Sequence, residues 1–528
     1  MAEPRADVTL TIEGVKVTVP KGTMILEAAK QAGVLIPHYC YHPGLPVAGV
    51  CRMCLVHVEG VPKLQIACAT PVGDNQVVRV FQDEAVEARK GVLEFLLINH
   101  PLDCPICDQA GECELQDYVF REGRATTRYT PDFAKRFNPV EDFGPDVLYV
   151  PNRCILCTRC VRFMEHAADD AILNVSERGD RAFIGVHPDR RLDHAWSGNV
   201  VDLCPVGSLL SKDFLHKARA WELDKTASVC TGCSQGCNVG LETRQNTVVR
   251  LRPRANPDVN AYFMCDHGRL YYRWMNRGDR IEAPLVRRDG ELVATDWDEA
   301  LRQATELLAG AGGEVLVLAS AGASTEALYL ARKAAGERFR GAYRVARTEG
   351  ERPLPGVANL ALRAERVPNA RGADALGYGE RFEDALGAVS RAAVVIVLDE
   401  SLQGLAADAL AGATHVIYVG TALPAHARDA RVVLPVTNVA EEDGTFVNRD
   451  GRVQRYMQAT GAPGMARPAW WVLGEVVAEL GRGEPPATAA EVFAALADEV
   501  AAFGGLTYDR LGWRGAVLGT GARAGAGV

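Results

Sequence analysis

The chain has 528 residues, of which 48% are hydrophobic and 24% charged, and its formal net charge is -9. This length is too great for a single hydrophobic core, so we expect three or more domains. The acidic balance and the lack of a basic run exclude a nucleic-acid backbone as the expected partner. The first residues lack a secretory pattern, and the longest apolar runs, 95–98 and 392–398, are too short to cross a membrane. We expect a cytosolic protein.

All 15 cysteines lie between Cys40 and Cys265, and the second half of the chain has none. In a reducing compartment so many thiols argue against a disulfide framework. The first half is therefore expected to bind metal, and the second half to have another role.

The amino-terminal segment predicts a small ferredoxin-like domain. Residues 8–19 alternate around Glu13 and Gly14, which predicts a hairpin, and Thr23 is expected to cap a helix that stops at Gly33. A hairpin, a helix and a cysteine loop resemble the β-grasp of plant-type ferredoxins. The predicted [2Fe–2S] ligands are Cys40, Cys51, Cys54 and Cys68.

The first gap of this group holds ten residues, where the plant-type spacing has four. The tight pair Cys51 and Cys54 is kept, and a longer first loop can close the same four-thiolate shell. Gly49 and Gly60 bracket the pair, which buried apolar cysteines would not explain.

A second group follows an amphipathic helix predicted over 84–99 and ended by Pro101. It supplies three thiols, Cys104, Cys107 and Cys113. Three thiolates leave one ligand missing, and His100, at the helix end, is the nearest candidate for a [4Fe–4S] cluster. His38 and His42 flank Cys40, which already has three thiolate partners.

The third group has the spacing of a bacterial ferredoxin, C-x2-C-x2-C with a distant Cys-Pro. Its predicted [4Fe–4S] ligands are Cys154, Cys157, Cys160 and Cys204. A two-cluster ferredoxin would carry four more cysteines, and here those positions are Met164, His194, Ser197 and Val200. One cluster is therefore expected.

The fourth group predicts a third [4Fe–4S] cluster, with structural zinc as the alternative because zinc also binds paired thiolates. Its ligands are Cys230, Cys233, Cys237 and Cys265. With His100, the 15 cysteines then complete four four-ligand sites and leave no free thiol.

Beyond Cys265 helices and apolar strands alternate, the pattern of a layered α/β domain with parallel strands. The expected helices are 297–309 and 325–335, and the expected strands are 314–319, 393–398 and 414–419. Nucleotide-binding glycine motifs are absent from the sequence. The small-residue tail 519–528 is expected to be mobile.

These motifs resemble one family closely, the large iron–sulfur subunit of respiratory complex I, NADH:quinone oxidoreductase. Its signature stretches are matched at 101–117, 153–163 and 202–210. The resemblance covers about residues 1–280, and it continues more weakly to about residue 460, where the chain looks like molybdopterin-dependent oxidoreductases at 280–301 and 442–454.

The resemblance implies a multidomain α+β and α/β protein. Its expected parts are a β-grasp [2Fe–2S] ferredoxin domain at 1–83, a [4Fe–4S] domain with one histidine and three cysteine ligands at 84–140, a ferredoxin-like single [4Fe–4S] domain at 141–222, a four-cysteine [4Fe–4S] domain at 223–280 and a shortened molybdopterin-oxidoreductase-like α/β domain at 281–528. The last part departs from the molybdenum enzymes, since no cysteine follows Cys265 and His267 replaces their lysine. We expect a degenerate scaffold without molybdopterin.

The implied function is electron transfer from NADH, through FMN on a partner subunit, toward quinone. The implied partners are the FMN- and NADH-binding subunit, the small [2Fe–2S] subunit and the quinone-proximal iron–sulfur subunits, on the cytoplasmic face of a bacterial inner membrane reached only through these partners. Family resemblance places the Cys230 cluster off the main path. The alternatives are an electron-transfer subunit of an NAD-linked hydrogenase or formate dehydrogenase, a molybdenum enzyme and a zinc-binding structural protein.

Overall fold

The computed structural model describes residues 7–129, 135, 137–399 and 405–519. It divides into two compact units. The first unit comprises Met1–Leu223 with Leu354–Ala358, and the second comprises Asp224–Pro353 with Asn359–Val528.

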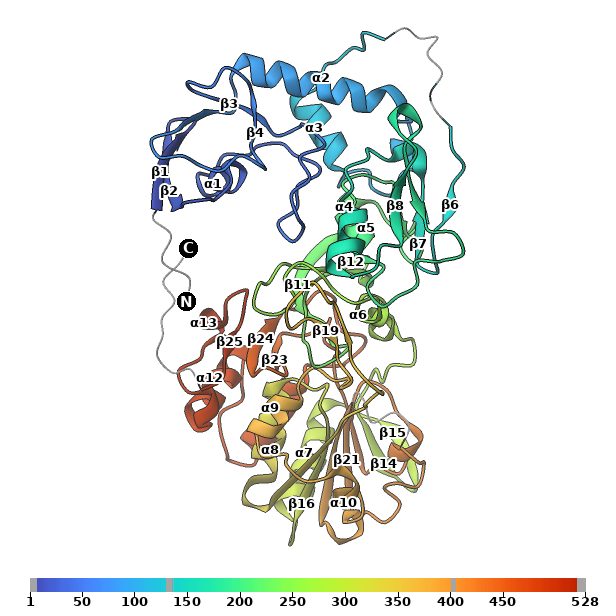
Figure 1. Cartoon of the computed structure of the whole chain (residues 1–528). Coiled ribbons are helices and arrows are strands. Elements are labelled where there is room, and N and C mark those ends of the chain that lie inside the picture. Colours follow the sequence, from blue (N-terminus) through green and yellow to red (C-terminus); the bar gives the residue numbers. More distant parts are fainter. Residues whose placement is uncertain (1–6, 130–134, 136, 400–404, 520–528) are drawn as a thin grey trace. The chain divides into compact units, whose positions relative to one another are not determined.

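The first unit begins with a five-stranded mixed sheet packed on one helix (Figure 1). Its elements are β1 (Asp7–Ile12), β2 (Val15–Pro20), α1 (Ile25–Gln31), β3 (Leu55–Val58), β4 (Gln65–Ile66) and β5 (Val77–Arg79). The strand order is β2-β1-β5-β3-β4, and β1 runs parallel to β5. The predicted hairpin is confirmed: β1 and β2 are antiparallel, and Glu13 and Gly14 both have positive φ, as tight hairpin turns require.

Thr23 does not cap the first helix, so that prediction is wrong. The residue before the helix is Met24, which makes no side-chain cap. The Thr23 hydroxyl instead donates to the Pro20 carbonyl at 2.7 Å, because Thr23 belongs to the turn that follows β2 and its hydroxyl closes that turn.

The helix predicted before Pro101 forms as α2 (Asp83–Asn99) and buries one face, at Ala85, Arg89 and Leu93, but its apolar residues do not all lie on that face. Phe95 is 71% exposed, whereas Arg89 is completely buried. The Arg89 guanidinium donates to the carbonyl oxygens of Leu55 at 3.1 Å and Val80 at 2.9 Å. A charged side chain can occupy the buried face because Glu122 forms an ion pair with it and backbone carbonyls of the β-grasp domain accept its hydrogen bonds.

The rest of the first unit consists of short elements joined by loops, and the cysteines lie mostly in those loops. The elements are η1 (Cys104–Ile106), α3 (Glu114–Glu122), β6 (Glu141–Asp142), β7 (Val147–Tyr149), η2 (Pro151–Arg153), α4 (Arg159–Arg162), the π-helical turn η3 (Phe163–Ala167), β8 (Leu173–Ser176), η4 (Gly179–Arg181), β9 (Phe183–Val186), α5 (Asn199–Leu203), β10 (Leu209–Ser211) and η5 (Ala220–Glu222). Strands β10, β7 and β6 form one small sheet, and β8 and β9 another.

The second unit begins with an antiparallel three-stranded sheet and two short helices that carry the fourth cysteine group. These elements are β11 (Asp224–Val229), β12 (Asn238–Arg244), β13 (Thr247–Pro253), α6 (Asp266–Leu270) and η6 (Tyr271–Asn276).

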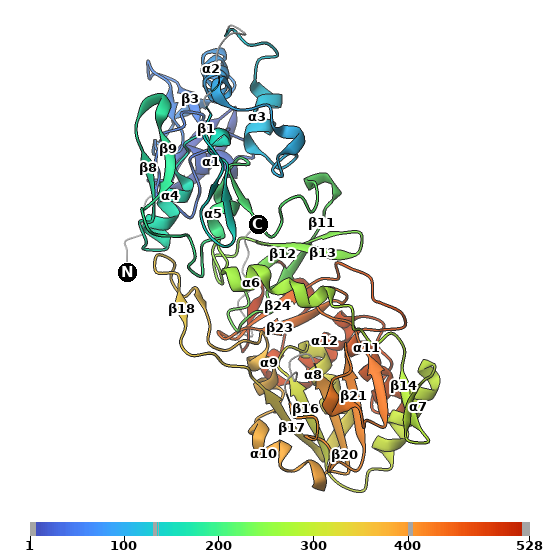
Figure 2. The same ribbon diagram turned by 90° about the vertical axis from the view of Figure 1, so that its right-hand side faces the viewer.

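A seven-stranded sheet in the order β15-β14-β22-β21-β20-β16-β17 forms the centre of the second unit (Figure 2). Its strands are β14 (Leu285–Arg288), β15 (Glu291–Ala294), β16 (Val315–Ser320), β17 (Phe339–Arg344), β20 (Val394–Asp399), β21 (Val416–Gly420) and β22 (Val432–Pro435). Strands β17, β16, β20, β21 and β22 are parallel. This confirms the parallel arrangement predicted for the three strands found in the sequence, which correspond to β16, β20 and β21.

Both faces of this sheet are buried, as parallel sheets require. Helices α7 (Trp297–Ala309), α8 (Thr325–Ala335), α11 (Ala469–Glu479) and α12 (Ala489–Glu499) contribute to the core on one face. On the other face the core includes α10 (Phe382–Leu386) and η8 (Val389–Arg391). The bounds of α7 and α8 are those the sequence predicts, because Asp296 and Ser324 each cap a clear apolar period.

The remaining elements of the second unit flank this core. They are η7 (Gly336–Arg338), β18 (Arg352–Pro353), β19 (Ala361–Leu362), α9 (Ala370–Ala375), η9 (Ala425–Ala427), β23 (Gly444–Val447), β24 (Arg452–Tyr456), η10 (Ala501–Phe503), α13 (Tyr508–Leu511) and β25 (Ala516–Val517). Of the predicted tail, Gly519 is described and the rest lies outside the described residues. Among the described helices, none combines the length and apolarity needed to cross a bilayer.

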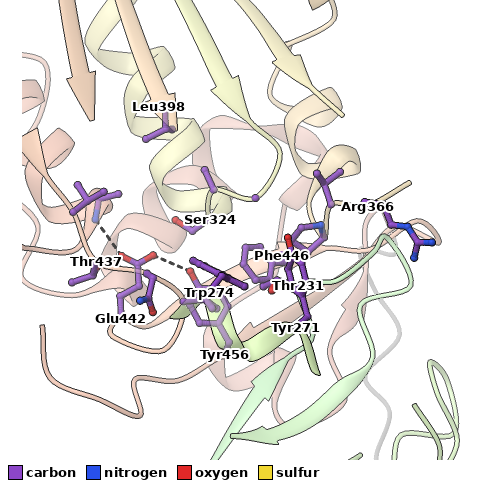
Figure 3. Close-up of a pocket in the computed structure, with 18 residues that line it drawn as sticks. Thr231, Tyr271, Trp274, Ser324, Arg366, Leu398, Thr437, Glu442, Phe446 and Tyr456 are labelled. Atoms are coloured by element: carbon purple, nitrogen blue, oxygen red, sulfur yellow. Dashed lines mark hydrogen bonds between the residues drawn. The ribbon is translucent and has the colours of Figure 1, made fainter. Parts of the chain in front are cut away.

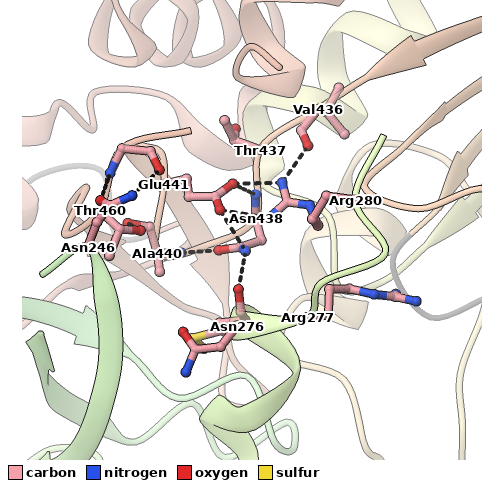
Figure 4. Close-up of polar contacts among 12 residues, drawn as sticks. Asn246, Asn276, Arg277, Arg280, Val436, Thr437, Asn438, Ala440, Glu441 and Thr460 are labelled. Carbon is pink, nitrogen blue, oxygen red and sulfur yellow. Dashed lines mark hydrogen bonds and ion pairs between the residues drawn. The ribbon is translucent and has the colours of Figure 1, made fainter. Parts of the chain in front are cut away.

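A buried ion pair holds the cysteine-bearing part of the second unit against the loop after β22 (Figure 4). Both terminal nitrogens of Arg280 bind the Glu441 carboxylate, at 2.7 and 2.8 Å. Asn438 donates to the Met275 carbonyl at 3.0 Å and to Glu441 at 3.2 Å. The cysteine region is thereby fixed to the carboxyl edge of the sheet.

Candidate metal centres

The first cysteine group lies in the loop between α1 and β3 and just after β4. The Cys40 amide donates to the Cys51 sulfur at 3.5 Å. Side-chain hydrogen bonds also join Cys40 to Cys68 and Cys54 to Cys68. Gly49 has φ +65°, which lets the loop reverse before the tight pair. The structure therefore brings these four thiols together.

The second group contains one exposed thiol, Cys104, and two buried thiols, Cys107 and Cys113. Gly207, from a distant part of the first unit, approaches so closely that a Cβ there would lie 2.1 Å from the Cys107 sulfur. Burial raises the pKa of the Cys113 thiol to about 12, so this site favours neutral thiols unless a cation is bound.

His100 directly follows α2 and is its C-cap residue. Burial, assisted by the positive charges of Lys135 and Arg153, lowers the pKa of His100 to about 4. The imidazole is therefore neutral at physiological pH, which is the form that ligates metals. Ligation by this ring stays a prediction.

The third group depends on a loop with two left-handed residues, Leu156 at φ +52° and Thr158 at φ +58°. These turn the chain between successive cysteines, and the Leu156 amide donates to the Cys154 sulfur at 3.4 Å. Burial raises the pKa of Cys157 to about 12 and that of Cys204 to about 11. The four thiols of this group lie close enough to interact electrostatically; they are Cys154, Cys157, Cys160 and Cys204.

Of the four positions where a second ferredoxin cluster would need cysteines, three belong to the interior of the first unit and the fourth, His194, is half-buried. Met164 and Val200 are completely buried, and Ser197 is 1% exposed. His194 accepts a hydrogen bond from the Trp196 amide at 3.0 Å. Met164, Ser197 and Val200 thus form part of the packed interior.

The fourth group is buried throughout and belongs to the second unit. Its thiols are Cys230, Cys233, Cys237 and Cys265. The Gly232 amide donates to the Cys230 sulfur at 3.4 Å and the Gly268 amide to the Cys265 sulfur at 3.3 Å. A Cβ on Gly268 would lie 2.9 Å from the Cys230 sulfur.

Buried arginines connect the cysteine loops of the first unit. Arg159 pairs with Glu114 at 2.9 Å and donates to the Tyr41 carbonyl at 2.9 Å. Arg162 donates to the Cys40 carbonyl. The first, second and third cysteine groups are thus joined through guanidinium groups.

Sequence reasoning missed these arginines. The signal that could have found them is their position beside the cysteines, as in Arg153-Cys154 and Arg159-Cys160. Arg153 pairs with Asp103 at 3.0 Å, next to the second group.

The residues present fit iron–sulfur clusters. Buried thiols, backbone amides aimed at sulfur and glycines in contact with sulfur make a water-excluding, hydrogen-bonding cradle. Among the described residues, no group of three or more His, Cys, Asp or Glu side chains is arranged closely enough to hold a single metal ion. The ligands of a cluster sit on different irons and are spaced more widely than those of one ion.

Five family models match the chain in order. They are a 2Fe-2S iron-sulfur cluster binding domain at 5–82, an NADH-ubiquinone oxidoreductase-G iron-sulfur binding region at 89–128, the ferredoxin-like domain of NADH-quinone oxidoreductase subunit 3 at 144–210, a molybdopterin oxidoreductase Fe4S4 domain at 223–277 and a molybdopterin oxidoreductase model at 396–479. This order confirms the predicted fold class.

The G subunit of NADH-quinone oxidoreductase from Rickettsia bellii is 40% identical over 61% of this chain and 47% of its own length. The 78 kDa subunit of mitochondrial NADH-ubiquinone oxidoreductase from Neurospora crassa is 45% identical over 57% of this chain and 40% of its own. This chain is a homologue of the G subunit of NADH-quinone oxidoreductase. It spans less than half the length of these two relatives.

The Mycobacterium bovis G subunit is likewise 40% identical, over 61% of this chain and 41% of its own length. A crystal structure of an NAD+-reducing [NiFe]-hydrogenase in the H2-reduced state is 30% identical and covers 40% of this chain and 91% of its own, with a TM-score of 0.36. By its family models, the chain carries 2Fe-2S and 4Fe-4S binding domains of the kind found in the G subunit.

Proposed function

We propose that this chain is an electron-transfer subunit of an NADH:quinone oxidoreductase. It would receive electrons from a flavin-bearing, NADH-oxidising partner and pass them toward a quinone-reducing partner. The observation that carries this proposal is the set of four cysteine groups, whose mostly buried thiols lie within the matching family models. Its domains are proposed at 1–83, 84–140, 141–222, 223–280 and 281–528.

The proposed cofactors are one [2Fe–2S] and three [4Fe–4S] clusters, without molybdopterin. The proposed ligands are Cys40, Cys51, Cys54 and Cys68; His100, Cys104, Cys107 and Cys113; Cys154, Cys157, Cys160 and Cys204; and Cys230, Cys233, Cys237 and Cys265. A bound iron–sulfur cluster supplies one-electron redox chemistry without making or breaking substrate bonds.

The chain's own residues set the conditions for that chemistry. Amides of Leu156, Gly232 and Gly268 donate to cysteine sulfurs, which stabilises the more negative state of a site and raises its potential. Gly207 and Gly268 let backbone replace water beside sulfur. Exclusion of water keeps the solvent reorganisation energy of electron transfer small and protects the thiolates from oxidation.

The proposed partners are the flavin subunit, the small [2Fe–2S] subunit and the quinone-proximal iron–sulfur subunits of the same complex. The proposed location is the cytoplasmic face of a bacterial inner membrane, reached through those partners.

The test is EPR spectroscopy and metal analysis of the anaerobically purified chain and of its complex. We expect about fourteen iron atoms per chain, from one [2Fe–2S] and three [4Fe–4S] clusters, and no stoichiometric zinc or molybdenum. NADH added to the complex should reduce the EPR-visible clusters. A second cluster in the ferredoxin-like region, or reduction by hydrogen or formate in place of NADH, would favour the hydrogenase or formate dehydrogenase alternative.

A further inference from the structure

The segment that follows β19 lies against the fourth cysteine group. The Ser234 amide donates to the Glu365 carbonyl at 2.9 Å. The backbone of Arg363 also forms a hydrogen bond with the Cys233 sulfur. These two contacts bind the segment to the cysteine loop from backbone to backbone and from backbone to sulfur. They fix the position of the next residue, Arg366, beside that loop.

The Arg366 guanidinium is only partly satisfied by the protein. Its Nε donates to the Thr348 hydroxyl at 3.2 Å. Its Nη1 is buried and has no hydrogen-bond partner among the described residues. In the described part of the chain Arg366 also makes no ion pair with a carboxylate. A buried donor without an acceptor costs free energy, so an anion beside this guanidinium would be stabilising.

Arg366 lies close to two separate parts of the fourth cysteine group. Its positive charge acts on the Cys233 thiol, in the loop between β11 and β12, and on His267 in α6. His267 follows Cys265, the last thiol of the group, by two residues. The guanidinium is therefore near both stretches of chain that supply thiols to this group.

Two other charged side chains act on these thiols, and each has a partner of opposite charge. Arg363 donates to the Glu351 carboxylate at 2.8 Å. Asp266 acts on the neighbouring thiol and lies 3.6 Å from Arg269. Arg366 differs from both, because its charge is not balanced by a described side chain. A positive charge is thus left beside the fourth cysteine group.

A buried carboxylate lies across a cavity from Arg366 and does not balance its charge (Figure 3). The cavity, of about 120 Å³, is at the carboxyl edge of the seven-stranded sheet, and segments at the ends of β16, β20 and β22 form its walls. Arg366 and Glu442 lie at opposite ends of it (Figure 3). The Glu442 oxygens accept from Thr437 at 2.7 Å and Tyr456 at 3.0 Å, so this carboxylate is held by neutral donors.

We propose that Arg366 sets the redox potential of the cluster bound by the fourth cysteine group, by placing an unbalanced positive charge and a hydrogen-bond donor beside it. This inference rests on the proposed electron-transfer function. A cluster held by four thiolates is anionic, and reduction adds a further negative charge. A neighbouring cation therefore stabilises the reduced state more than the oxidised state and raises the midpoint potential.

The test is a redox titration of the full, anaerobically purified chain with its clusters, followed by EPR. Cys237→Ala removes a proposed ligand and identifies the signal of the fourth cluster by its loss. Arg366→Gln removes the charge, and we expect the ratio of reduced to oxidised cluster at a fixed potential to fall about tenfold, which is a midpoint potential lower by about 59 mV. Arg366→Lys keeps the charge and should change this ratio by less than about twofold.

Arg381→Gln is the matched control, because it removes the same charge from the same unit. The Arg381 side chain is 77% exposed and lies beside Asp384 at the start of α10, at the opposite end of the second unit from α6 (Figures 1 and 2). This variant should titrate as the unchanged chain does.

Loss of the fourth cluster in Arg366→Gln but not in Arg366→Lys would also support a need for the charge. The inference is overturned if iron-replete Arg366→Gln titrates as the control does, or if Arg366→Lys behaves as Arg366→Gln does. An unchanged chain that binds no cluster at the fourth group would overturn the proposed cofactors together with this inference. Its iron content, about four atoms below the expected total, distinguishes that case.

Discussion

In the first unit, loops that carry three cysteine groups are joined by buried guanidinium groups, whereas in the second unit a parallel sheet is buried between two layers of helices. Short loops bury many backbone carbonyls and little apolar surface, so Arg89, Arg159 and Arg162 satisfy those carbonyls. The sheet satisfies its own backbone and gains stability from apolar burial. Metal binding and folding should therefore be coupled more tightly in the first unit.

Gly207→Ala should have the largest effect. A Cβ at Gly207 would lie 2.1 Å from the Cys107 sulfur, far inside contact distance, so the loop must move and the second group must open. We expect loss of about four irons per chain and of one EPR signal. Gly91→Ala is the control, because a Cβ there meets nothing within 4 Å. Full iron content in Gly207→Ala would contradict the role of this close approach.

Arg159→Met should come next. It leaves the buried Tyr41 carbonyl without its donor and the 38% exposed Glu114 carboxylate without its ion-pair partner, which together should cost about 1–3 kcal/mol, and iron should be lost together with stability. Leu318→Ala, at a completely buried position of β16, is the counterpart in the second unit. It should cost about 2–5 kcal/mol but leave the iron of the first unit in place. Thermal unfolding with parallel iron analysis measures both, and equal iron loss would remove the contrast between the units.

Glu326→Gln tests the polar interior of the second unit. Burial raises the pKa of Glu326 from 4.5 to about 7, so the folded state holds its proton more tightly than the unfolded state. Stability from this group is fully present below pH 4.5 and is lost as pH rises toward 7, by about 3 kcal/mol at 1.36 kcal/mol per pH unit.

Glutamine cannot titrate, so the variant should flatten the fall in unfolding free energy between about pH 5 and pH 8 as measured with denaturant. Glu306→Gln, at an exposed ion pair with Arg302, provides the control. An unchanged pH slope in Glu326→Gln would show that other groups govern it.

His100→Cys should have the smallest structural effect. A thiolate adds one negative charge where a neutral imidazole stood, so the oxidised cluster gains stability relative to the reduced one. We expect unchanged iron content and a midpoint potential lower by roughly 100 mV in a redox titration followed by EPR. An unchanged potential would exclude His100 as a ligand.

Local patterns were sufficient to predict several parts of the structure. Helices α7 and α8 were predictable because their caps and apolar period are local features of the sequence. The hairpin was predictable because Glu13-Gly14 suits a tight turn. The prediction that Thr23 caps the first helix was wrong because the Thr23 hydroxyl is hydrogen-bonded within the preceding turn. The apolar pattern of α2 did not predict that Arg89 is buried, because Arg89 donates to carbonyls outside its own helix, one of them on a strand distant in sequence.

The sequence by itself determined the cysteine groups and the alternation of helices and strands in the second half, since spacing and periodicity are written along the chain. The tertiary structure decided which charges are buried, where Gly207 meets Cys107 and which strands border the cavity. Those features join residues far apart in sequence. They depend on how much space and how many hydrogen-bond partners the folded chain leaves, which no local pattern encodes.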